Sequence, residues 1–339
     1  MSARRSAQQG FALILVLWIL SLMTIMAGSF TLSMRRESAI IEGIKHNAET
    51  QSIAESGLAL AQFMLLNPEA HSRWRADGSV YEIDFGHAKV RIRLLSEVGK
   101  IDINTANQKL LSALITNAPI EDEKARTKLL NAILDWRDAD EVVREDGAEK
   151  DEYKQAKLSY TPRNKRFRSI EELQMVLGMN AEVFQWLTPL ITVYSGQEVD
   201  VKLAAKDVLQ VLPGLDAGKI DDYVMLRKQN NMNGLPTPDF PVNGAEVDEN
   251  IVEPIEQVAA EGDVEAEVEI GAVELIAEVQ IDDSVNTMVS VVVEQSDTGV
   301  GAPFKVLKWY RNYSGAESLF ADEMSELLVG QYAEPQLNN

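Results

Sequence analysis

The sequence has no cysteine, few histidines and a shortage of basic residues. Without cysteine, the fold cannot use disulfide bonds or thiolate metal sites. His46, His71 and His87 are scattered, lack the spacing of metal ligands, and are interpreted as surface residues. The chain has 32 Lys and Arg against 53 Asp and Glu, for a net charge of −21. This balance argues against a general nucleic-acid binder, since binding DNA requires a basic footprint over the phosphates.

Sequence signatures of catalysis are also missing. The chain contains no G-x-S-x-G, no H-E-x-x-H and no phosphate-binding loop. A metal hydrolase would need an open, activating metal site, and no histidine lies near the acidic stretch considered below. The sequence therefore favours a protein that is not an enzyme, with a metalloenzyme built on the acidic stretch as an alternative.

Charged residues are absent from Phe11 to Met34. About 20 apolar residues, each rising ~1.5 Å, span the ~30 Å hydrocarbon core of a bilayer. Arg4 and Arg5 precede this run, and a short basic leader favours an N-terminus in the cytoplasm. A signal-anchor helix is the simplest interpretation. A removable secretory signal fits less well, because its apolar region should have only ~7–15 residues.

The junction before the apolar run supports a third interpretation. A short polar leader ends in Gly10, Phe11 follows at once, and the apolar helix starts there. This junction resembles the class III signal of type IV prepilins. The resemblance implies that a prepilin peptidase cuts after Gly10 and methylates the new N-terminal Phe11.

Leu15 departs from the pattern of most pilins and pseudopilins, which carry Glu at the fifth position of the mature chain. A carboxylate buried in lipid is costly unless it is paired, and the family's usual partner is the N-terminal amine of a neighbouring subunit. A subunit at the tip has no subunit above it and can do without the acid. Within the type II secretion family, the K-type minor pseudopilin is the member that lacks this Glu.

The membrane helix is predicted to continue to Leu66. Small and apolar residues recur at spacings near 3.6, and no proline interrupts before Pro68. Residues 79–96 then change to the two-residue period of strands, on either side of Gly86 and His87. The first of these strands is acidic and the second is basic. This favours their pairing as a hairpin with one buried face.

Residues 99–194 are predicted to be helical. Thr105 and Gln108 form the pattern of a capping box before the first helix, and a second helix is expected over 120–136. Ser169 is expected to cap a third helix, which Gly178 ends. A weaker echo of the first helices occupies 195–235, with a helix ending near residue 227.

The composition changes to acidic residues without Lys or Arg over 236–270, which predicts a solvated linker. Alternating patterns return at 273–281, around Met288 and over 304–310, and predict strands. These strands form no stable sheet of their own, so they are expected to join the 79–96 hairpin. The expected fold class is α+β: a long pilin helix packed on an antiparallel sheet, with a large all-α (SAM-like, helix-hairpin) insertion.

Carboxylates are dense over 135–153. They repel one another unless solvated or neutralised, and a hard cation such as Ca²⁺ takes about 6–8 oxygen ligands. The register of an EF-hand is absent, so the spacing alone favours a solvated loop. The series D-W-x-D-x-D, G-A-E, Tyr, P-R-N and F-R-S-I-E-E-L, however, is similar to the helical domain of the K-type minor pseudopilin. That resemblance implies a structural Ca²⁺ site, with these candidate ligands: Asp138, Asp140 and Glu149, then Asp135 and Asp151.

Two segments, 103–106 and 212–215, resemble helix-hairpin-helix modules that grip DNA phosphates through backbone N–H groups at a helix start. Such modules need a glycine-rich hairpin with Lys or Arg beside it. No glycine occurs at 117–120, and Asp216 stands where a phosphate would lie. Both segments are interpreted as packing modules and no nucleic-acid partner is expected. A membrane-anchored DNA-binding and uptake protein is the alternative function.

The resemblance to the K-type minor pseudopilin of the type II secretion system covers nearly the whole chain. It implies an inner-membrane protein with a cytoplasmic N-terminus and a periplasmic head. Its implied place is the tip of the pseudopilus, where it starts assembly and supports export of folded proteins across the outer membrane. The implied partners are the I-type and J-type minor pseudopilins, the major pseudopilin and the prepilin peptidase.

The expected organisation has a sheet domain interrupted by helical units. Its parts are a leader (1–10), a transmembrane helix (11–34) and its periplasmic continuation (35–66), a sheet domain (67–98 and 271–311), two helical units (99–194 and 195–235), an acidic linker (236–270) and a C-terminal tail (312–339).

Overall fold

The computed structural model of the chain describes residues 9–69, 71–241, 271–281, 284–296, 302–311, 313 and 317–333. The chain divides into two compact units, Met1–Ser52 and Ile53–Asn339. Helix α1, Gln9–Leu65, begins in the first unit and ends in the second. The long continuous helix expected from the sequence is therefore present.

The first unit consists of the N-terminal part of α1, whose apolar side chains are exposed. A window of 18 residues in this helix has a mean hydropathy of 2.3, with 0% of it buried, so α1 is long and apolar enough to cross a membrane. Ser21, Thr24 and Thr31 donate their hydroxyl groups to carbonyl oxygens four residues earlier. These bonds satisfy the polar groups within the helix, as a hydrocarbon environment requires.

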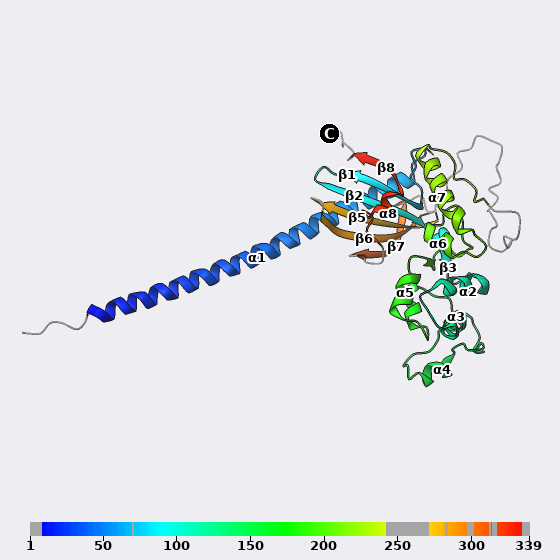
Figure 1. The fold of residues 1–339 in the computed structure, drawn as a ribbon, viewed down its shortest axis with the longest axis horizontal. Helices are drawn as coiled ribbons and strands as arrows, with labels where there is room; N and C mark the ends of the chain where they lie inside the picture. Colours follow the sequence, from blue (N-terminus) through cyan, green and yellow to red (C-terminus); the bar gives the residue numbers. More distant parts are fainter. Residues whose placement is uncertain are drawn as a thin grey trace, which may run out of the picture. The chain divides into compact units, whose positions relative to one another are not determined.

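Six strands form the sheet of the second unit, in the order β7–β6–β5–β2–β1–β8 (Figure 1). Their bounds are β1 Asp77–Asp84, β2 Ala88–Ser96, β5 Ala272–Ile281, β6 Ser284–Gln295, β7 Phe304–Arg311 and β8 Leu328–Ala333. The expected strands are all present, and the later ones join the hairpin through the pairing of β2 with β5.

Strand β8 corrects two expectations. The sequence indicated a tail over 312–339, yet that range contains the short helix α8, Asp322–Ser325, and strand β8. Strand β8 pairs with β1 in parallel, so the sheet is not purely antiparallel. Its sequence, L-V-G-Q-Y-A, lacks the alternation of a half-buried strand. The open edge of β1, rather than a local pattern, makes this segment a strand.

The C-terminal part of α1 packs on one face of the sheet. Four residues at helical spacing are buried in the same apolar core as the inner residues of β2 and β5: Ala54, Leu58, Ala61 and Leu65. Gly57 allows a close approach, because a Cβ atom there would lie 3.0 Å from Cγ1 of Val90. Burial of this apolar stripe holds this part of the helix on the sheet.

The β1–β2 hairpin confirms the expected pairing of an acidic with a basic strand. Glu82 lies opposite Arg91, and Asp84 lies opposite Lys89. Nε of Arg91 donates to Oε2 of Glu82 at 2.8 Å. The same guanidinium donates to the carbonyl oxygen of Leu319 at 2.9 Å, so Arg91 also ties the segment before β8 to the sheet.

The region between β2 and β5 is an insertion, because these two strands are neighbours in the sheet. Its elements are η1 Glu97–Gly99, β3 Ile101–Asp102, α2 Gln108–Asn117, α3 Glu123–Arg137, α4 Lys150–Gln155, η2 Ile170–Met175, α5 Ala181–Leu187, β4 Ile191–Thr192, α6 Lys206–Val211 and α7 Ala217–Met232. One apolar core runs through the insertion, from Ile101 to Val224. The insertion is not entirely helical, since β3 and β4 pair in parallel.

Several helix ends differ from the expected positions. Asn107, not Thr105, caps α2, since its side chain accepts from Leu110 N at 2.9 Å. The segment after Ser169 is the 3-10 helix η2, and Ser169 makes no side-chain cap bond. Helix α3 begins at 123 rather than 120, and α7 continues to 232 rather than ending near 227. Each N-terminal end depends on which polar side chain reaches the free N–H groups, and several neighbours are chemically equivalent.

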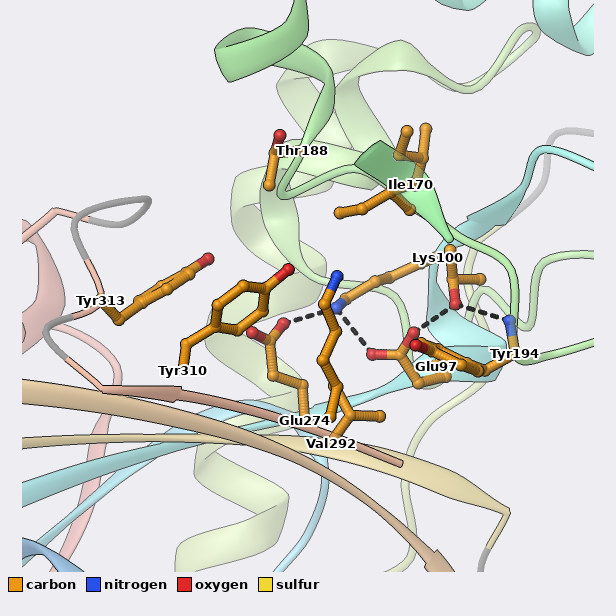
Figure 2. A pocket seen from close by; sticks show the side chains of 12 residues that line it. Glu97, Lys100, Ile170, Thr188, Tyr194, Glu274, Val292, Tyr310 and Tyr313 are labelled. Carbon is orange, nitrogen blue, oxygen red and sulfur yellow. Dashed lines mark hydrogen bonds and ion pairs between the residues drawn. The ribbon is translucent and has the colours of Figure 1, made fainter. Parts of the chain in front are cut away.

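A buried ion network joins the insertion to the sheet (Figure 2). Nζ of Lys100 donates to Oε1 of Glu97 at 2.7 Å and to Oε2 of Glu274 at 2.6 Å. Ser290 donates to the other oxygen of Glu274 at 2.6 Å, and Thr192 donates to Glu97. One lysine between two glutamates therefore connects the start of the insertion to strand β5, and Thr192 links β4 to the same network.

A second polar contact joins η2 to the edge strand β7. Lys308 and Tyr310 both donate to the carboxylate of Glu171. Burial opposes the shift, but the hydrogen bonds from these two residues lower the pKa of Glu171 to about 2. Glu171 therefore stays ionised in neutral and mildly acidic solution.

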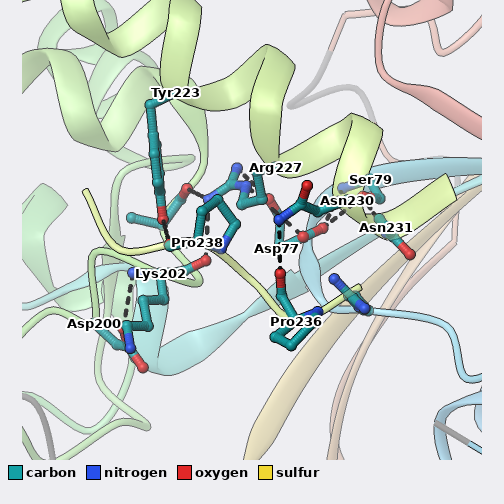
Figure 3. Close-up of polar contacts among 12 residues, drawn as sticks. Asp77, Ser79, Asp200, Lys202, Tyr223, Arg227, Asn230, Asn231, Pro236 and Pro238 are labelled. Carbon is teal, nitrogen blue, oxygen red and sulfur yellow. Dashed lines mark hydrogen bonds and ion pairs between the residues drawn. The ribbon is translucent and has the colours of Figure 1, made fainter. Parts of the chain in front are cut away.

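Arg227 and Asn231 fix α7 to the start of β1 (Figure 3). Arg227 donates to the carbonyl oxygen of Asp77 at 2.6 Å and to that of Ala204 at 2.7 Å. Nδ2 of Asn231 donates to the hydroxyl of Ser79 at 3.0 Å. These side chains are buried, so α7 docks on the sheet through satisfied polar groups.

The expected acidic linker, 236–270, is described only as far as Pro241. The hydroxyl of Tyr223 donates to the carbonyl oxygen of Pro238 at 3.1 Å. The ring of Phe240 meets that of Tyr223 edge-on, with centroids 4.9 Å apart. The first residues of this range therefore pack on α7, and residues 242–270 lie outside the described part of the chain.

Candidate functional site

The acidic loop, residues 138–149, connects α3 to α4. Helix α3 ends at Arg137 because Asp138 takes an extended backbone conformation. Trp136, in the last turn, is fully buried and stacks on Phe167 with ring centroids 6.1 Å apart. Packing of this helix end in the core therefore fixes the point at which the loop begins.

Asp135 organises the loop from inside the protein, where it is fully buried. Its Oδ2 accepts from Ala148 N at 2.8 Å and from Arg144 N at 3.3 Å. Gly147 is required beside it, because a Cβ atom there would lie 2.1 Å from the same oxygen. One carboxylate at the end of α3 thus holds the returning half of the loop.

Arg144 lies between two of the carboxylates. Its Nη1 donates to Oδ1 of Asp135 at 2.6 Å and also to Oδ2 of Asp138. It is the single basic residue in the loop. Sequence patterns did not single out Arg144 as part of the site, although a lone arginine in a run of acids was a visible signal.

Glu149 and Asp140 lie close to these groups. Nδ2 of Asn164 donates to Oε2 of Glu149 at 3.3 Å and to the carbonyl oxygen of Asp140. Burial raises the pKa of Glu149 against the opposing bond from Asn164, and the charges of Asp135, Asp138 and Asp140 add to the rise. Asn164 thus links the carboxylate of Glu149 to the backbone of Asp140, whose own exposed carboxylate accepts from Val142 N at 2.8 Å. The residues Asp135, Asp138, Asp140 and Glu149 are here termed the acidic cluster.

Asp151 lies outside the acidic cluster. Its side chain is 78% exposed on α4, and it accepts from Nζ of Lys154 at 2.9 Å. This hydrogen bond lowers the pKa of Asp151. Within the described ranges, no group of three or more His, Cys, Asp or Glu side chains is arranged to hold a metal ion. The acidic cluster instead has the guanidinium of Arg144 between its carboxylates.

Two carboxylate oxygens of the acidic cluster are buried without a hydrogen-bond partner, Oδ1 of Asp138 and Oε1 of Glu149. An unsatisfied buried acceptor costs about 1–3 kcal/mol. Hard cations such as Ca²⁺ take carboxylate oxygens of this kind as ligands. The chemistry of the donor set therefore fits Ca²⁺.

The helix-hairpin segments present carboxylates where a phosphate-binding module would present open N–H groups. Asp216 caps α7 and accepts from Gly218 N at 2.9 Å. Asp102 accepts from Asn104 N and from Gly196 N, each at 2.7 Å. An anion at these positions would have to displace an acid of the chain itself.

The expected processing residues lie at the start of α1. Gly10 and Phe11 belong to its first turn, and the side chain of Phe11 lies outside the described part. Leu15 follows one turn later on the apolar helix.

Comparison with known proteins finds sequence similarity to one family. A sequence model of the family "Type II secretion system (T2SS), protein K" matches residues 89–196, a range that includes the whole acidic loop. Type II secretion system protein K of Pectobacterium carotovorum subsp. carotovorum is 30% identical over 210 residues, which cover 55% of this chain and 63% of that protein. Over these residues the chain is similar to the protein K family of type II secretion systems.

Further members of the protein K family are matched with similar coverage. Protein K of Klebsiella pneumoniae is 23% identical over 58% of this chain and 66% of its own length. The Pectobacterium and Klebsiella proteins are thus each matched over slightly less than two thirds of their length. A chain in the crystal structure of the GspK–GspI–GspJ complex from enterotoxigenic Escherichia coli aligns over 83% of this chain and 99% of its own. Its sequence identity is 15% and its TM-score is 0.45.

Proposed function

We propose that the chain is a minor pseudopilin at the tip of the type II secretion pseudopilus. There it initiates assembly and supports the export of folded proteins across the outer membrane. Similarity to the protein K family carries this proposal. The long apolar helix α1 and its attachment to a sheet domain agree with a pilin-like subunit. The role is that of an assembly component and not of an enzyme.

Two features favour the tip position. Leu15 stands where most pseudopilins carry Glu, so the chain brings no acid into the bilayer to pair with a neighbouring amine. The insertion between β2 and β5 adds bulk that would obstruct a subunit stacked above it. Immunogold labelling of assembled pseudopili tests this position. Label confined to one end supports the tip, and label spread along the shaft rejects it.

The proposed topology places the N-terminus in the cytoplasm and the second unit in the periplasm, because Arg4 and Arg5 precede the apolar run.

A prepilin peptidase is proposed to cut after Gly10 and to methylate Phe11. Intact mass and N-terminal sequencing of the protein, purified from membranes with its processing machinery, test this step. A chain that starts at methylated Phe11 supports the prepilin class, whereas an intact Met1 makes it an ordinary signal-anchored protein.

The proposed partners are the I-type and J-type minor pseudopilins, with the major pseudopilin in the shaft. Similarity to the protein K family supports this set. Coexpression of the tagged full-length chain with both minor pseudopilins tests it. Recovery of both in fixed proportion supports the assignment, and recovery of neither rejects it.

A structural Ca²⁺ is proposed in the acidic cluster, with Asp138, Asp140 and Glu149 as ligands. Asp135 would hold the loop through its bond from Ala148 N. The unpartnered oxygens of Asp138 and Glu149 support this assignment. Bound Ca²⁺ supplies positive charge and takes carboxylate oxygens as ligands, which would offset the repulsion among the four carboxylates.

Thermal melting of the full-length chain in detergent, with Ca²⁺ or with EDTA, tests the site. Ca²⁺ at a free concentration 100 times its dissociation constant stabilises the folded state by about 2.7 kcal/mol. Asp138→Asn should remove most of this effect. Asp151→Asn is the matched control and should keep it, since Asp151 is exposed outside the acidic cluster. No shift of the wild type at millimolar Ca²⁺ would reject the site.

A further inference from the structure

Arg144 binds the acidic cluster in the way a cation would. Its Nη1 contacts a carboxylate oxygen of Asp135 at 2.6 Å and one of Asp138. Among the ion pairs of the described residues, both that reach the acidic cluster come from this side chain. Arg137, the nearest arginine in sequence, instead donates to the carbonyl oxygen of Ala106 at 2.7 Å. Arg144 is thus the basic group that directly bonds these carboxylates.

The charge of Arg144 compensates the acidic cluster only in part. The guanidinium bonds the carboxylates of Asp135 and Asp138, whereas Oδ1 of Asp138 and Oε1 of Glu149 remain without a donor. Ca²⁺ brings two charges and takes about 6–8 oxygen ligands. A guanidinium and Ca²⁺ on the same Asp138 carboxylate would also repel each other at a separation of a few ångströms. The two cations are therefore alternatives at this site.

We propose that Arg144 competes with Ca²⁺ for the acidic cluster: its guanidinium substitutes for the cation in the metal-free chain, and bound Ca²⁺ expels it to solvent. This inference rests on the proposed calcium site. The side chain of Arg144 is 38% exposed, which leaves it a route to solvent. Asp135 is buried and keeps its bond from Ala148 N at 2.8 Å when the guanidinium leaves. Arg144 thereby keeps the loop closed without metal and sets the concentration at which Ca²⁺ binds.

Calorimetric titration of the full-length chain in detergent with Ca²⁺ tests the competition. Arg144→Gln removes the guanidinium, and the matched control Arg166→Gln removes one positive charge from an exposed residue of a nearby loop. We expect Arg144→Gln to bind Ca²⁺ about tenfold more tightly, or ~1.4 kcal/mol, and Arg166→Gln to bind like the wild type. Equal affinities for the two variants would overturn the competition but leave the calcium site in place. Absence of binding in the wild type and both variants would reject the calcium site itself.

Melting separates competition from a purely structural role. In EDTA, Arg144→Gln should melt below the wild type, because the carboxylates of Asp135 and Asp138 have lost the guanidinium that bonds them. Saturating Ca²⁺ should close that gap, whereas a gap of unchanged size would overturn the proposal. Arg144→Lys keeps the charge but replaces the planar fork by one ammonium. Arg144→Lys should bind Ca²⁺ with an affinity between those of the wild type and Arg144→Gln. This variant also tests the proposal if Arg144→Gln fails to fold. An affinity equal to that of the wild type would count against the competition.

Discussion

Replacement of Lys100 by Met should strongly destabilise the second unit. The ammonium of Lys100 lies 2.7 Å from Glu97 and 2.6 Å from Glu274, and their side chains are only 2% and 9% exposed. Removing one partner of a buried ion pair costs about 3–5 kcal/mol, because the remaining charge stays buried without compensation. Two carboxylates are left here, so we expect a loss of about 5 kcal/mol at neutral pH.

The pH dependence of this loss has a definite direction. In the wild type, burial raises the pKa of Glu97 although Lys100 opposes the shift. Without Lys100, the pKa of Glu97 would rise further, and Glu274 would lose the charge and hydrogen bond that lower its pKa against the effect of burial. Burial and mutual repulsion would then hold the pKa of both glutamates above the unfolded value of about 4.3. A raised folded pKa means that the folded variant binds protons more readily than the unfolded chain. The loss is therefore full at pH values above the raised pKa and shrinks as the pH falls.

Chemical denaturation of the full-length chain in detergent, measured at pH 7 and pH 5, provides the assay. Lys305→Met is the matched control, because Lys305 lies 3.7 Å from Glu294 and the two side chains are 69% and 46% exposed. An exposed pair of this kind contributes less than about 1 kcal/mol. A loss for Lys100→Met no larger than that of the control, or one that grows as the pH falls, would refute the reasoning.

Three further outcomes follow from single contacts. Glu171→Gln should loosen η2 from β7, which faster amide hydrogen exchange in η2 would reveal. In the wild type, the stabilisation from the ionised Glu171 is fully present above about pH 4.3 and is lost as the pH falls through about 2. Gly147→Ala would force a Cβ atom to within 2.1 Å of Asp135 and should weaken Ca²⁺ binding at least about tenfold by calorimetry. An unchanged affinity would contradict that close approach. Leu58→Ala, at a buried position of α1, should cost about 2–5 kcal/mol of unfolding free energy, whereas Phe63→Ala, 69% exposed on the same helix, should cost much less.

Periodicity was sufficient for the long helix α1 and for most strands of the main sheet. The uncharged run and the continuing helical spacing identify α1, because every turn of a helix repeats the same local geometry. Alternation identifies five of the six strands of the main sheet, and the opposite charges of Glu82 and Arg91 correctly indicate the pairing of β1 with β2. The acidic loop was visible as well, since its carboxylates are close in sequence.

Contacts between distant segments were decided by the tertiary structure alone. Lys100 and Glu274 are separated by 174 positions, and no local pattern relates them. Strand β8 forms because the chain returns to the open edge of β1. In the acidic loop, the resemblance to the K-type minor pseudopilin included Asp151 among the candidate ligands, but α4 directs this side chain to solvent. The bonds made by Arg144 place its guanidinium between Asp135 and Asp138. Local periodicity follows from the geometry of one element, whereas these contacts depend on how the whole chain packs.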